Sequence, residues 1–203
     1  MKLIGLTGGI ASGKSTVRAM LRDLGAEVLD ADAVYHELIA PRQQGEPSPL
    51  ARQIEGRFPG VLGRDGVIDR SKLGPRVFAD TEERRALEAI AHPAVTHEVE
   101  RRIQELREAG CGLVVYDVPL LFERGLQERM DGVIVVWTSP EAQMARLVKR
   151  GISPREVEQR LTSQLPMDEK RRRATWVIDN DGNLDETREQ VERVWGEIAT
   201  PRW

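Results

Sequence analysis

Short apolar runs alternate with longer amphipathic stretches along this chain of 203 residues. Three runs, at 3–7, 112–117 and 132–137, are rich in Leu, Ile and Val, as strands buried on both faces usually are. Shorter runs at 26–29 and 176–178 predict two further strands. Because helical stretches separate the runs, the pattern predicts an α/β fold, a parallel sheet flanked by helices.

The helices expected beside these strands have apolar positions that recur three and four residues apart. The sequence predicts them at 15–24, 32–40 and 184–198, and Gly25 is suited to end the first of them. A further helical block, from 139 to 173, is dense in arginine.

The middle of the chain departs from this alternation. Residues 41–66 are rich in Pro, Gly and charge, so they cannot form a core strand. Residues 71–109 have a helical pattern, and Pro93 is expected to mark a break or the start of a new helix. A simple crossover between parallel strands needs far less chain than this. The region is therefore predicted to be a helical insertion at the rim of the sheet.

Composition narrows the class of protein. A net charge of −3 argues against a protein that mainly coats nucleic acid. No apolar run approaches the roughly 20 residues that span a bilayer, and the first residues lack a signal-peptide pattern. The single cysteine, Cys111, cannot form an internal disulfide, which fits a reducing compartment. We expect a soluble, cytoplasmic protein that needs no membrane, nucleic acid or obligate protein partner.

A glycine-rich segment carries the clearest chemical signal. Residues 8–15, Gly-Gly-Ile-Ala-Ser-Gly-Lys-Ser, fit the motif G-x-x-x-x-G-K-[ST] between a predicted strand and a predicted helix. The backbone N–H groups of such a loop bind phosphate oxygens together with the positive end of the helix. Lys14 would reach the β- and γ-phosphates of ATP, and the Ser15 hydroxyl would help to hold Mg²⁺. The predicted ATP-binding residues are Gly8, Gly9, Ile10, Ala11, Ser12, Gly13, Lys14, Ser15 and Thr16.

This loop alone indicates a nucleoside triphosphate site and no particular activity. A GTPase would usually carry an Asn-Lys-x-Asp segment, which the chain lacks, and no long arm suggests a motor. Three hypotheses stay open at this point. The first is a kinase that transfers the γ-phosphoryl group of ATP in-line to a hydroxyl, and the second is a kinase with a different acceptor, such as a nucleotide or nucleoside. The third is a module that binds nucleotide to regulate a partner.

Two carboxylates follow the second predicted strand, at the edge where open parallel sheets bind ligands. For Asp30 we favour a role as helix N-cap, which Asp performs well. Asp32 also suits the positive first turn of a helix, but it is the better candidate to accept a proton from a substrate hydroxyl. Asp117 ends an apolar strand, where a Walker-B carboxylate acts on Mg²⁺ through water; its alternative role is to cap the turn before Pro119.

Arginines of the second helical block are candidates to stabilise a transferring phosphoryl group. Arg146 and Arg150 lie four residues apart, on one face of a predicted helix, and a mobile helical segment could bring them to the nucleotide. A solvated basic face is the alternative, and it is favoured for the run 171–173. The histidines lack metal-ligand spacing, which argues against a zinc site.

Taken together, these motifs resemble the dephospho-CoA kinase family over nearly the whole chain. The combination of Asp-Ala-Asp with Asp-Val-Pro-Leu-Leu-Phe-Glu is far more specific than the phosphate loop. The matching segments include 6–16, 24–25, 30–32, 69–70, 77–78, 92–93, 117–123 and 177–180. The resemblance implies the last step of coenzyme A biosynthesis, in which ATP, with Mg²⁺, phosphorylates the ribose 3′-hydroxyl of dephospho-CoA.

The resemblance also implies roles for residues and regions. Asp32 is similar to the proposed catalytic base, Arg146 and Arg150 match the lid arginines, and Lys14 joins them as a catalytic residue. The acceptor would meet His92, which equally suits a structural role, together with Pro119, Leu120 and Phe122. Ser15 and Asp117 would serve the metal. The implied regions are a nucleotide-binding core at about 1–32, 111–140 and 174–203, a helical CoA-side insertion at about 33–110, and a lid at about 141–173.

Four residues depart from the family pattern. Ala11 replaces a more usual Gly, which we expect to be tolerable if Ala11 keeps a negative φ. His36 and Arg42 stand where Arg and Gly are frequent, beside the acceptor site, and Thr175 stands where Asp is common.

Overall fold

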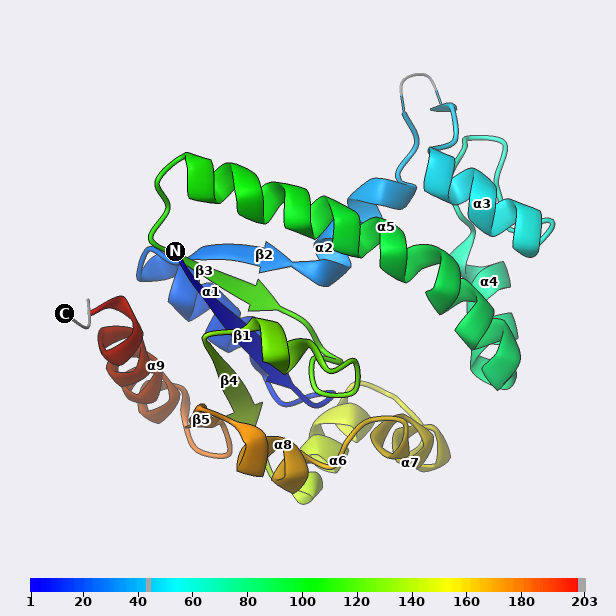
Figure 1. Cartoon of the computed structure of the whole chain (residues 1–203). Helices are drawn as coiled ribbons and strands as arrows, with labels where there is room; N and C mark the ends of the chain where they lie inside the picture. The colour runs from blue at the N-terminus through cyan, green and yellow to red at the C-terminus, as the bar shows by residue number, and fades with distance from the viewer. Residues whose placement is uncertain (43–44, 201–203) are drawn as a thin grey trace. The chain divides into compact units, whose positions relative to one another are not determined.

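The computed structural model describes residues 1–42 and 45–200, and only the backbone of residues 154, 155 and 160. Residues 43–44 of the expected insertion and residues 201–203 of the expected core therefore lie outside the described residues. The chain divides into two units (Figure 1). The first comprises Met1–Leu29 and Gly110–Trp203, and the second comprises Asp30–Ala109.

A five-stranded sheet forms the centre of the first unit, and its strand order is β2-β3-β1-β4-β5. Strand β1 pairs in parallel with both β3 and β4, and β4 pairs in parallel with β5. The parallel sheet flanked by helices that the pattern predicts is therefore confirmed. The strands are β1 (Lys2–Gly8), β2 (Glu27–Asp30), β3 (Leu113–Asp117), β4 (Gly132–Trp137) and β5 (Trp176–Asp179).

Helices α1 (Lys14–Asp23) and α9 (Leu184–Ala199) pack against each other and against the sheet, through β1 and β5 respectively. Their apolar faces supply Val17, Leu21 and Val191, which are fully buried with the strand residues of the main core. Helix α9 begins with a capping box, in which Asn183 and Glu186 satisfy each other's backbone N–H groups.

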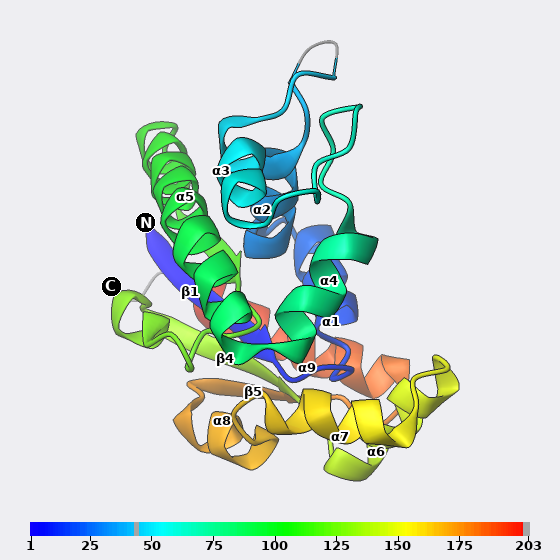
Figure 2. The ribbon, with the colours of Figure 1, turned by 90° about the vertical axis from the view of Figure 1, so that its right-hand side faces the viewer.

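Three shorter helices connect β4 to β5. They are α6 (Pro140–Lys149), α7 (Pro154–Thr162) and α8 (Met167–Arg173), and Figure 2 shows them in yellow-green to orange, in one group at the bottom of the view. Ser139 and Ser153 cap the first two, and each is followed by a proline at the first helical position. This is the region where the sequence analysis expects a lid.

The second unit is helical. Its elements are α2 (Ala31–Ile39), α3 (Pro49–Arg57), α4 (Arg70–Ala79) and α5 (Thr81–Glu108). Helix α5 contacts the other three, and they enclose a core around the fully buried Phe58 and Ile54. Arg57 and Arg76 each place a guanidinium over the Phe58 ring, at 4.9 and 5.5 Å from its centroid.

One feature of this unit contradicts the sequence-based expectation, and another goes beyond it. Pro93 neither breaks α5 nor starts a new helix, because it lies inside a helix of 28 residues. Proline removes one backbone donor, but α5 packs against three helices and buries Ala91, Val95 and Val99, so tertiary contacts outweigh the loss. The interruption falls instead at Asp80, whose carboxylate caps α5. Residues 41–66, expected only not to form a core strand, contain helix α3.

Candidate active site

The phosphate loop connects β1 to α1, and two of its glycines stand where no side chain fits. A Cβ at Gly8 would lie 2.5 Å from the Ser12 hydroxyl oxygen and 2.8 Å from the Val136 carbonyl oxygen. Gly13 has a φ of +87°, and a Cβ there would lie 2.0 Å from the amide nitrogen of Asn180. The motif's glycines therefore follow from space and backbone conformation.

Ala11 is the one described residue other than glycine with a positive φ, 59°. The condition under which we expect Ala11 to be tolerable, a negative φ, is therefore not met. A left-handed conformation brings the Ala Cβ close to the following carbonyl and costs about 1–2 kcal/mol. The Arg146 guanidinium donates to the Ala11 carbonyl oxygen at 3.2 Å. This contact helps to hold the loop in a conformation that glycine would adopt more readily.

Lys14 and Asp117 meet at the carboxyl end of β3. The Asp117 side chain is fully buried, and it forms ion pairs with Lys14 and with Arg18, the latter at 3.0 Å. Strand pairing places Asp117 opposite Leu6, just before the phosphate loop begins. A buried carboxylate is stable only when it is paired, and here two cations pair it. The sequence analysis missed Arg18, although its position four residues after Lys14 places both on one face of α1.

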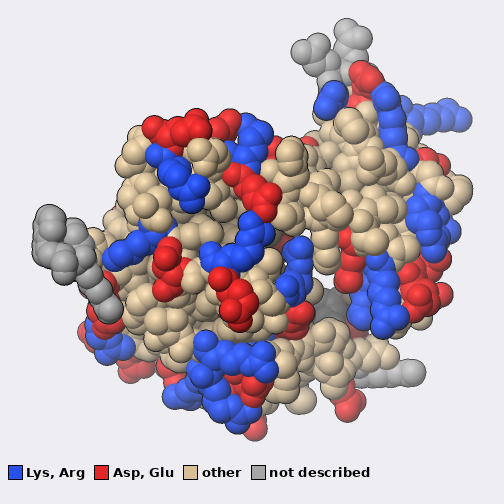
Figure 3. Space-filling view, in the orientation of Figure 1, with Lys and Arg blue, Asp and Glu red and all other residues tan. Residues whose placement is uncertain are grey.

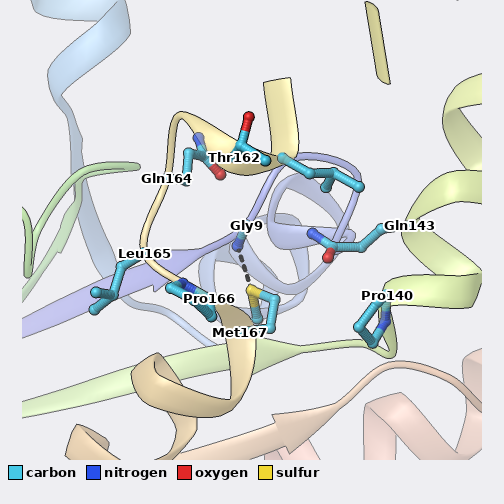
Figure 4. Close-up of a pocket in the computed structure, with 9 residues that line it drawn as sticks. Gly9, Pro140, Gln143, Thr162, Gln164, Leu165, Pro166 and Met167 are labelled. Atoms are coloured by element: carbon cyan, nitrogen blue, oxygen red, sulfur yellow. Dashed lines mark hydrogen bonds between the residues drawn. The ribbon is translucent and has the colours of Figure 1, made fainter. Parts of the chain in front are cut away.

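Side chains from the helices between β4 and β5 hold the outer side of the loop. Gln143 donates to the Ile10 carbonyl oxygen at 2.7 Å, and the Gln164 side-chain oxygen accepts from the Ile10 N–H at 2.9 Å. The Gly9 N–H donates to the Met167 sulfur at 3.0 Å. Figure 4 shows these side chains directed at the loop, around a cavity of about 420 Å³. None of the three was predicted, since no local motif marks them.

Arg146 and Asn180 brace the other side of the loop. Arg146 donates to the Asn180 carbonyl oxygen at 2.5 Å as well as to Ala11, and the Asn180 side chain donates to the Ser12 carbonyl oxygen at 2.7 Å. Thr187 in turn donates to the Asn180 side-chain oxygen at 2.9 Å. Arg150 differs, because it lies at the C-terminal end of α6 with its side chain exposed. The structure thus brings Arg146 to the loop, whereas Arg150 faces solvent.

The segment after β3 contains the residues expected to bind the acceptor. Pro119 and Leu120 are half-buried, whereas Phe122 is buried. The Pro119 carbonyl oxygen accepts from the Thr7 hydroxyl at 3.0 Å and from the Lys170 ammonium at 3.1 Å. This segment is therefore tied to the end of β1, where the phosphate loop starts.

Asp30 caps helix α2, as predicted. Its carboxylate accepts from the N–H groups of Asp32 and Ala33, at 2.9 and 3.3 Å. Asp32 lies exposed in the first turn of α2, and His92 is half-buried within α5. Both belong to the second unit and the phosphate loop belongs to the first, so a meeting of Asp32 or His92 with the loop stays a prediction.

The arginine run at the end of α8 forms a solvated face. Arg172 and Arg173 both pair with Glu169, and these hydrogen bonds lower the pKa of the Glu169 carboxyl. The Arg171 guanidinium lies 4.6 Å from the centroid of a Trp137 ring. Figure 3 shows Lys and Arg atoms gathered there, with Asp and Glu atoms among them.

Across the described residues, no group of three or more His, Cys, Asp or Glu side chains is arranged to hold a metal ion. None of the described helices combines the length and the apolar character that crossing a bilayer requires.

A protein-family model described as dephospho-CoA kinase matches residues 2–186, almost the entire described chain. The chain belongs to the dephospho-CoA kinase family. It is 53% identical, over 96% of its length and 80% of the relative, to a dephospho-CoA kinase of Symbiobacterium thermophilum. The identity is 46% with the dephospho-CoA kinase of Geobacter sulfurreducens, over 96% of this chain and 98% of that one.

Solved structures agree with this membership in the dephospho-CoA kinase family. A crystal structure of a Thermus thermophilus protein superposes with a TM-score of 0.81 at 37% identity, and it covers 98% of both chains. A dephospho-CoA kinase from Campylobacter jejuni superposes with a TM-score of 0.71 at 29% identity, again over 98% of both chains. Membership makes the chain a kinase, and therefore a phosphotransferase.

Thr175, His36 and Arg42 depart from the dephospho-CoA kinase pattern. Thr175 accepts from the Val133 N–H through its hydroxyl at 3.0 Å and donates its own N–H to the Val133 carbonyl at 2.9 Å, so it extends the pairing of β4 with β5. His36 lies exposed on α2, with its ring 5.7 Å from that of Tyr35. Arg42 is exposed, and its N–H donates to the Glu46 carbonyl at 2.7 Å.

Proposed function

We propose that this chain transfers the γ-phosphoryl group of ATP to the ribose 3′-hydroxyl of dephospho-CoA, which gives coenzyme A and ADP. The observation that carries the assignment of the site is the phosphate loop with Lys14 beside the buried Asp117. Membership of the dephospho-CoA kinase family supports dephospho-CoA as the acceptor, and the geometry of the loop supports the nucleotide site.

ATP is proposed to bind along residues 8–16, where the loop and the N-terminus of α1 present backbone N–H groups to its phosphates. Lys14 would exchange its ion pair with Asp117 for the β- and γ-phosphates. Arg18 would then remain on Asp117 and keep the buried carboxylate paired. The buried carboxylate of Asp117 would thus keep one cationic partner when the nucleotide binds.

The metal proposed to accompany ATP is Mg²⁺. Ser15 is exposed at the start of α1 and Asp117 lies beside Lys14, so the donors present are a hydroxyl and a carboxylate, which suit a hard cation. When bound, Mg²⁺ would neutralise charge that develops on the phosphates. Asp117 would act on it through water, and Ser15 directly.

The acceptor hydroxyl is proposed to meet Asp32, which would orient it and take its proton as the new O–P bond forms. His92 of the second unit and Pro119, Leu120 and Phe122 of the first would bind dephospho-CoA. In this proposal residues 33–110 form the CoA-side insertion, residues 141–173 form the lid, and the remaining core binds nucleotide.

Arg146 and Arg150 are proposed to stabilise charge on the transferring group. Arg146 already contacts the phosphate loop through Ala11, so it would act at short range. Arg150 is exposed at the end of α6, and it would contribute only when the lid closes. We also propose a cytoplasmic protein that acts without nucleic acid, membrane or obligate protein partner, as its net charge of −3 and single cysteine suggest.

The test is ATP turnover by the purified protein with dephospho-CoA, against a panel of nucleosides and nucleoside monophosphates. We expect turnover to depend on dephospho-CoA and the product to carry phosphate on the ribose 3′-oxygen. Faster turnover with a nucleoside or nucleotide would favour a different acceptor. ATP binding without turnover of any acceptor would favour a regulatory nucleotide-binding module.

A further inference from the structure

Lys170, in α8, is a fully buried lysine. Lysine is almost never fully buried unless it is paired, because its ammonium loses the water that solvates it. Here burial lowers the pKa of Lys170, the nearby Glu123 carboxylate opposes that effect, and the neighbouring Lys14 ammonium adds to it. A charge kept at such a cost calls for a reason beyond packing, since an apolar side chain of the same length would fill the space more cheaply.

The partners of Lys170 all belong to the segment that follows β3. Its ammonium donates to the Pro119 carbonyl oxygen at 3.1 Å and forms an ion pair with Glu123 at 2.8 Å. Glu123 also accepts from the Leu165 N–H at 2.9 Å, just before α8 begins. Residues 119–123 and 165–170 are thus joined at three points around one buried charge.

The same stretch of chain reaches the phosphate loop. Met167 accepts from the Gly9 N–H, and Gln164 accepts from the Ile10 N–H. Residues 164–170 therefore contact the loop proposed to bind ATP on one side and the segment proposed to bind the acceptor on the other. Lys170 provides the charged link between α8 and that acceptor segment.

We propose that Lys170 is a positioning residue for phosphoryl transfer, whose ammonium ties α8 to residues 119–123 and so holds the acceptor segment in register with the phosphate loop. This inference rests on the proposed function, because it assumes that Pro119, Leu120 and Phe122 bind dephospho-CoA. It predicts that loss of the charge impairs use of the acceptor much more than binding of ATP.

The first measurement compares Lys170→Met with Lys149→Met. Met nearly matches the length of Lys without its charge, and Lys149 is an exposed lysine on α6 of the same region, so it serves as the matched control. We expect Lys170→Met to raise the KM for dephospho-CoA at least about tenfold, while the Kd for ATP changes by less than about threefold. Lys170→Arg should recover part of the loss, because it restores the charge.

The second measurement needs no activity. Hydrogen exchange should be followed at the N–H groups of Arg124, Gly125 and Leu126, which bond to carbonyls of residues 120–122. In Lys170→Met we expect exchange there and at Leu165 to accelerate at least about tenfold, with β1 and β4 unchanged. Lys149→Met should exchange like the unmodified protein.

The outcomes separate the two proposals. Faster exchange at residues 124–126, together with a raised KM for dephospho-CoA, supports the positioning role. Unchanged hydrogen exchange at these residues overturns it. A lower melting temperature of Lys170→Met, with the KM and kcat of its folded fraction unchanged, also overturns it, because this result indicates that Lys170 has a purely structural role. If the unmodified protein does not phosphorylate dephospho-CoA, the proposed function fails, and the exchange measurement still decides whether Lys170 orders the segment.

Discussion

Asp117 and Glu98 are each flanked by two cations, but their surroundings differ. Asp117 in the first unit pairs with Lys14 and Arg18, and Glu98 in the second pairs with Arg101 and Arg102. The Asp117 side chain is fully buried, and one of its cations, Lys14, is the first residue of α1, directly after the phosphate loop. Glu98 and both of its arginines lie on one helix, α5, three and four residues apart.

The Glu98 cluster extends to another helix. Arg102 also pairs with Glu37 of α2, so the cluster links α2 to α5 inside the second unit. Its members all lie within helices of the second unit and away from the phosphate loop, so we expect its effect to be on stability. The Asp117 cluster joins α1 to β3, and in the proposed function its Lys14 leaves Asp117 for the phosphates of ATP. The comparison teaches that the place of a cation in the fold, beside the phosphate loop or in the middle of a helix, distinguishes a candidate site from a structural cluster better than the ion pair itself does.

Removing one cation from each cluster should give the largest contrast. Lys14→Ala is expected to lower kcat with dephospho-CoA at least about 10³-fold, since it removes the charge that we propose acts on the transferring phosphoryl group. The melting temperature should fall little, because Arg18 still pairs Asp117. Arg101→Ala, the matched change, should leave kcat nearly unaltered. Comparable turnover by the two variants would contradict the assignment of the phosphate loop.

A second comparison concerns Asp30 and Asp32 at the start of α2, and it tests whether the second unit contributes to catalysis as well as to structure. Asp32→Asn should keep ATP binding and lower kcat by about 10²- to 10⁴-fold, nearer the lower end because a loose transition state needs little base strength. Asp30→Asn should be milder, since Asn caps a helix about as well as Asp. The measurement is kcat and nucleotide Kd for both. A damaging Asp30→Asn beside a nearly silent Asp32→Asn would mean that the base is Asp30.

Low pH should destabilise the folded protein by protonating Glu98. Hydrogen bonds, first from Arg101 and then from Arg102, lower the pKa of Glu98 from 4.5 to about 2. A carboxyl whose pKa is lower in the folded protein contributes stability that is complete above pH 4.5 and is lost as the pH falls toward 2. Glu98→Gln should therefore flatten the loss of stability over that window, as measured by urea unfolding at several pH values. An identical pH profile for the variant and the unmodified protein would argue against the cluster as a brace.

The smallest expected effect concerns the backbone of the phosphate loop. Ala11→Gly relieves a left-handed alanine but adds freedom to the unfolded chain, so the free energy of unfolding should rise by no more than about 1 kcal/mol. Urea unfolding at neutral pH measures this, and kcat should stay close to that of the unmodified protein. A clear loss of stability would show that Ala11 carries no strain in the folded protein.

Local rules account for much of what could be predicted. The strands, the helix after the phosphate loop and the Asp30 cap follow from periodicity, glycine spacing and capping, each of which involves neighbours in sequence. Pro93 shows the limit of such rules, because contacts of α5 with three other helices override a local helix breaker. Helix α3 shows it again, since the Pro and Gly around it obscure a helix that Ser48 caps.

The features of the candidate site also fall into two groups, those that the sequence predicts and those that only the structure shows. The sequence by itself determined that a phosphate loop follows the first strand and that Asp117 ends the neighbouring strand, since both depend on residues adjacent in the chain. Only the tertiary structure decided that Arg18 joins Lys14 on Asp117, that Arg146 and Asn180 hold the loop, and that Lys170 is buried against Pro119 and Glu123. Packing brings these partners together across long stretches of sequence, and no motif records which side chains will meet.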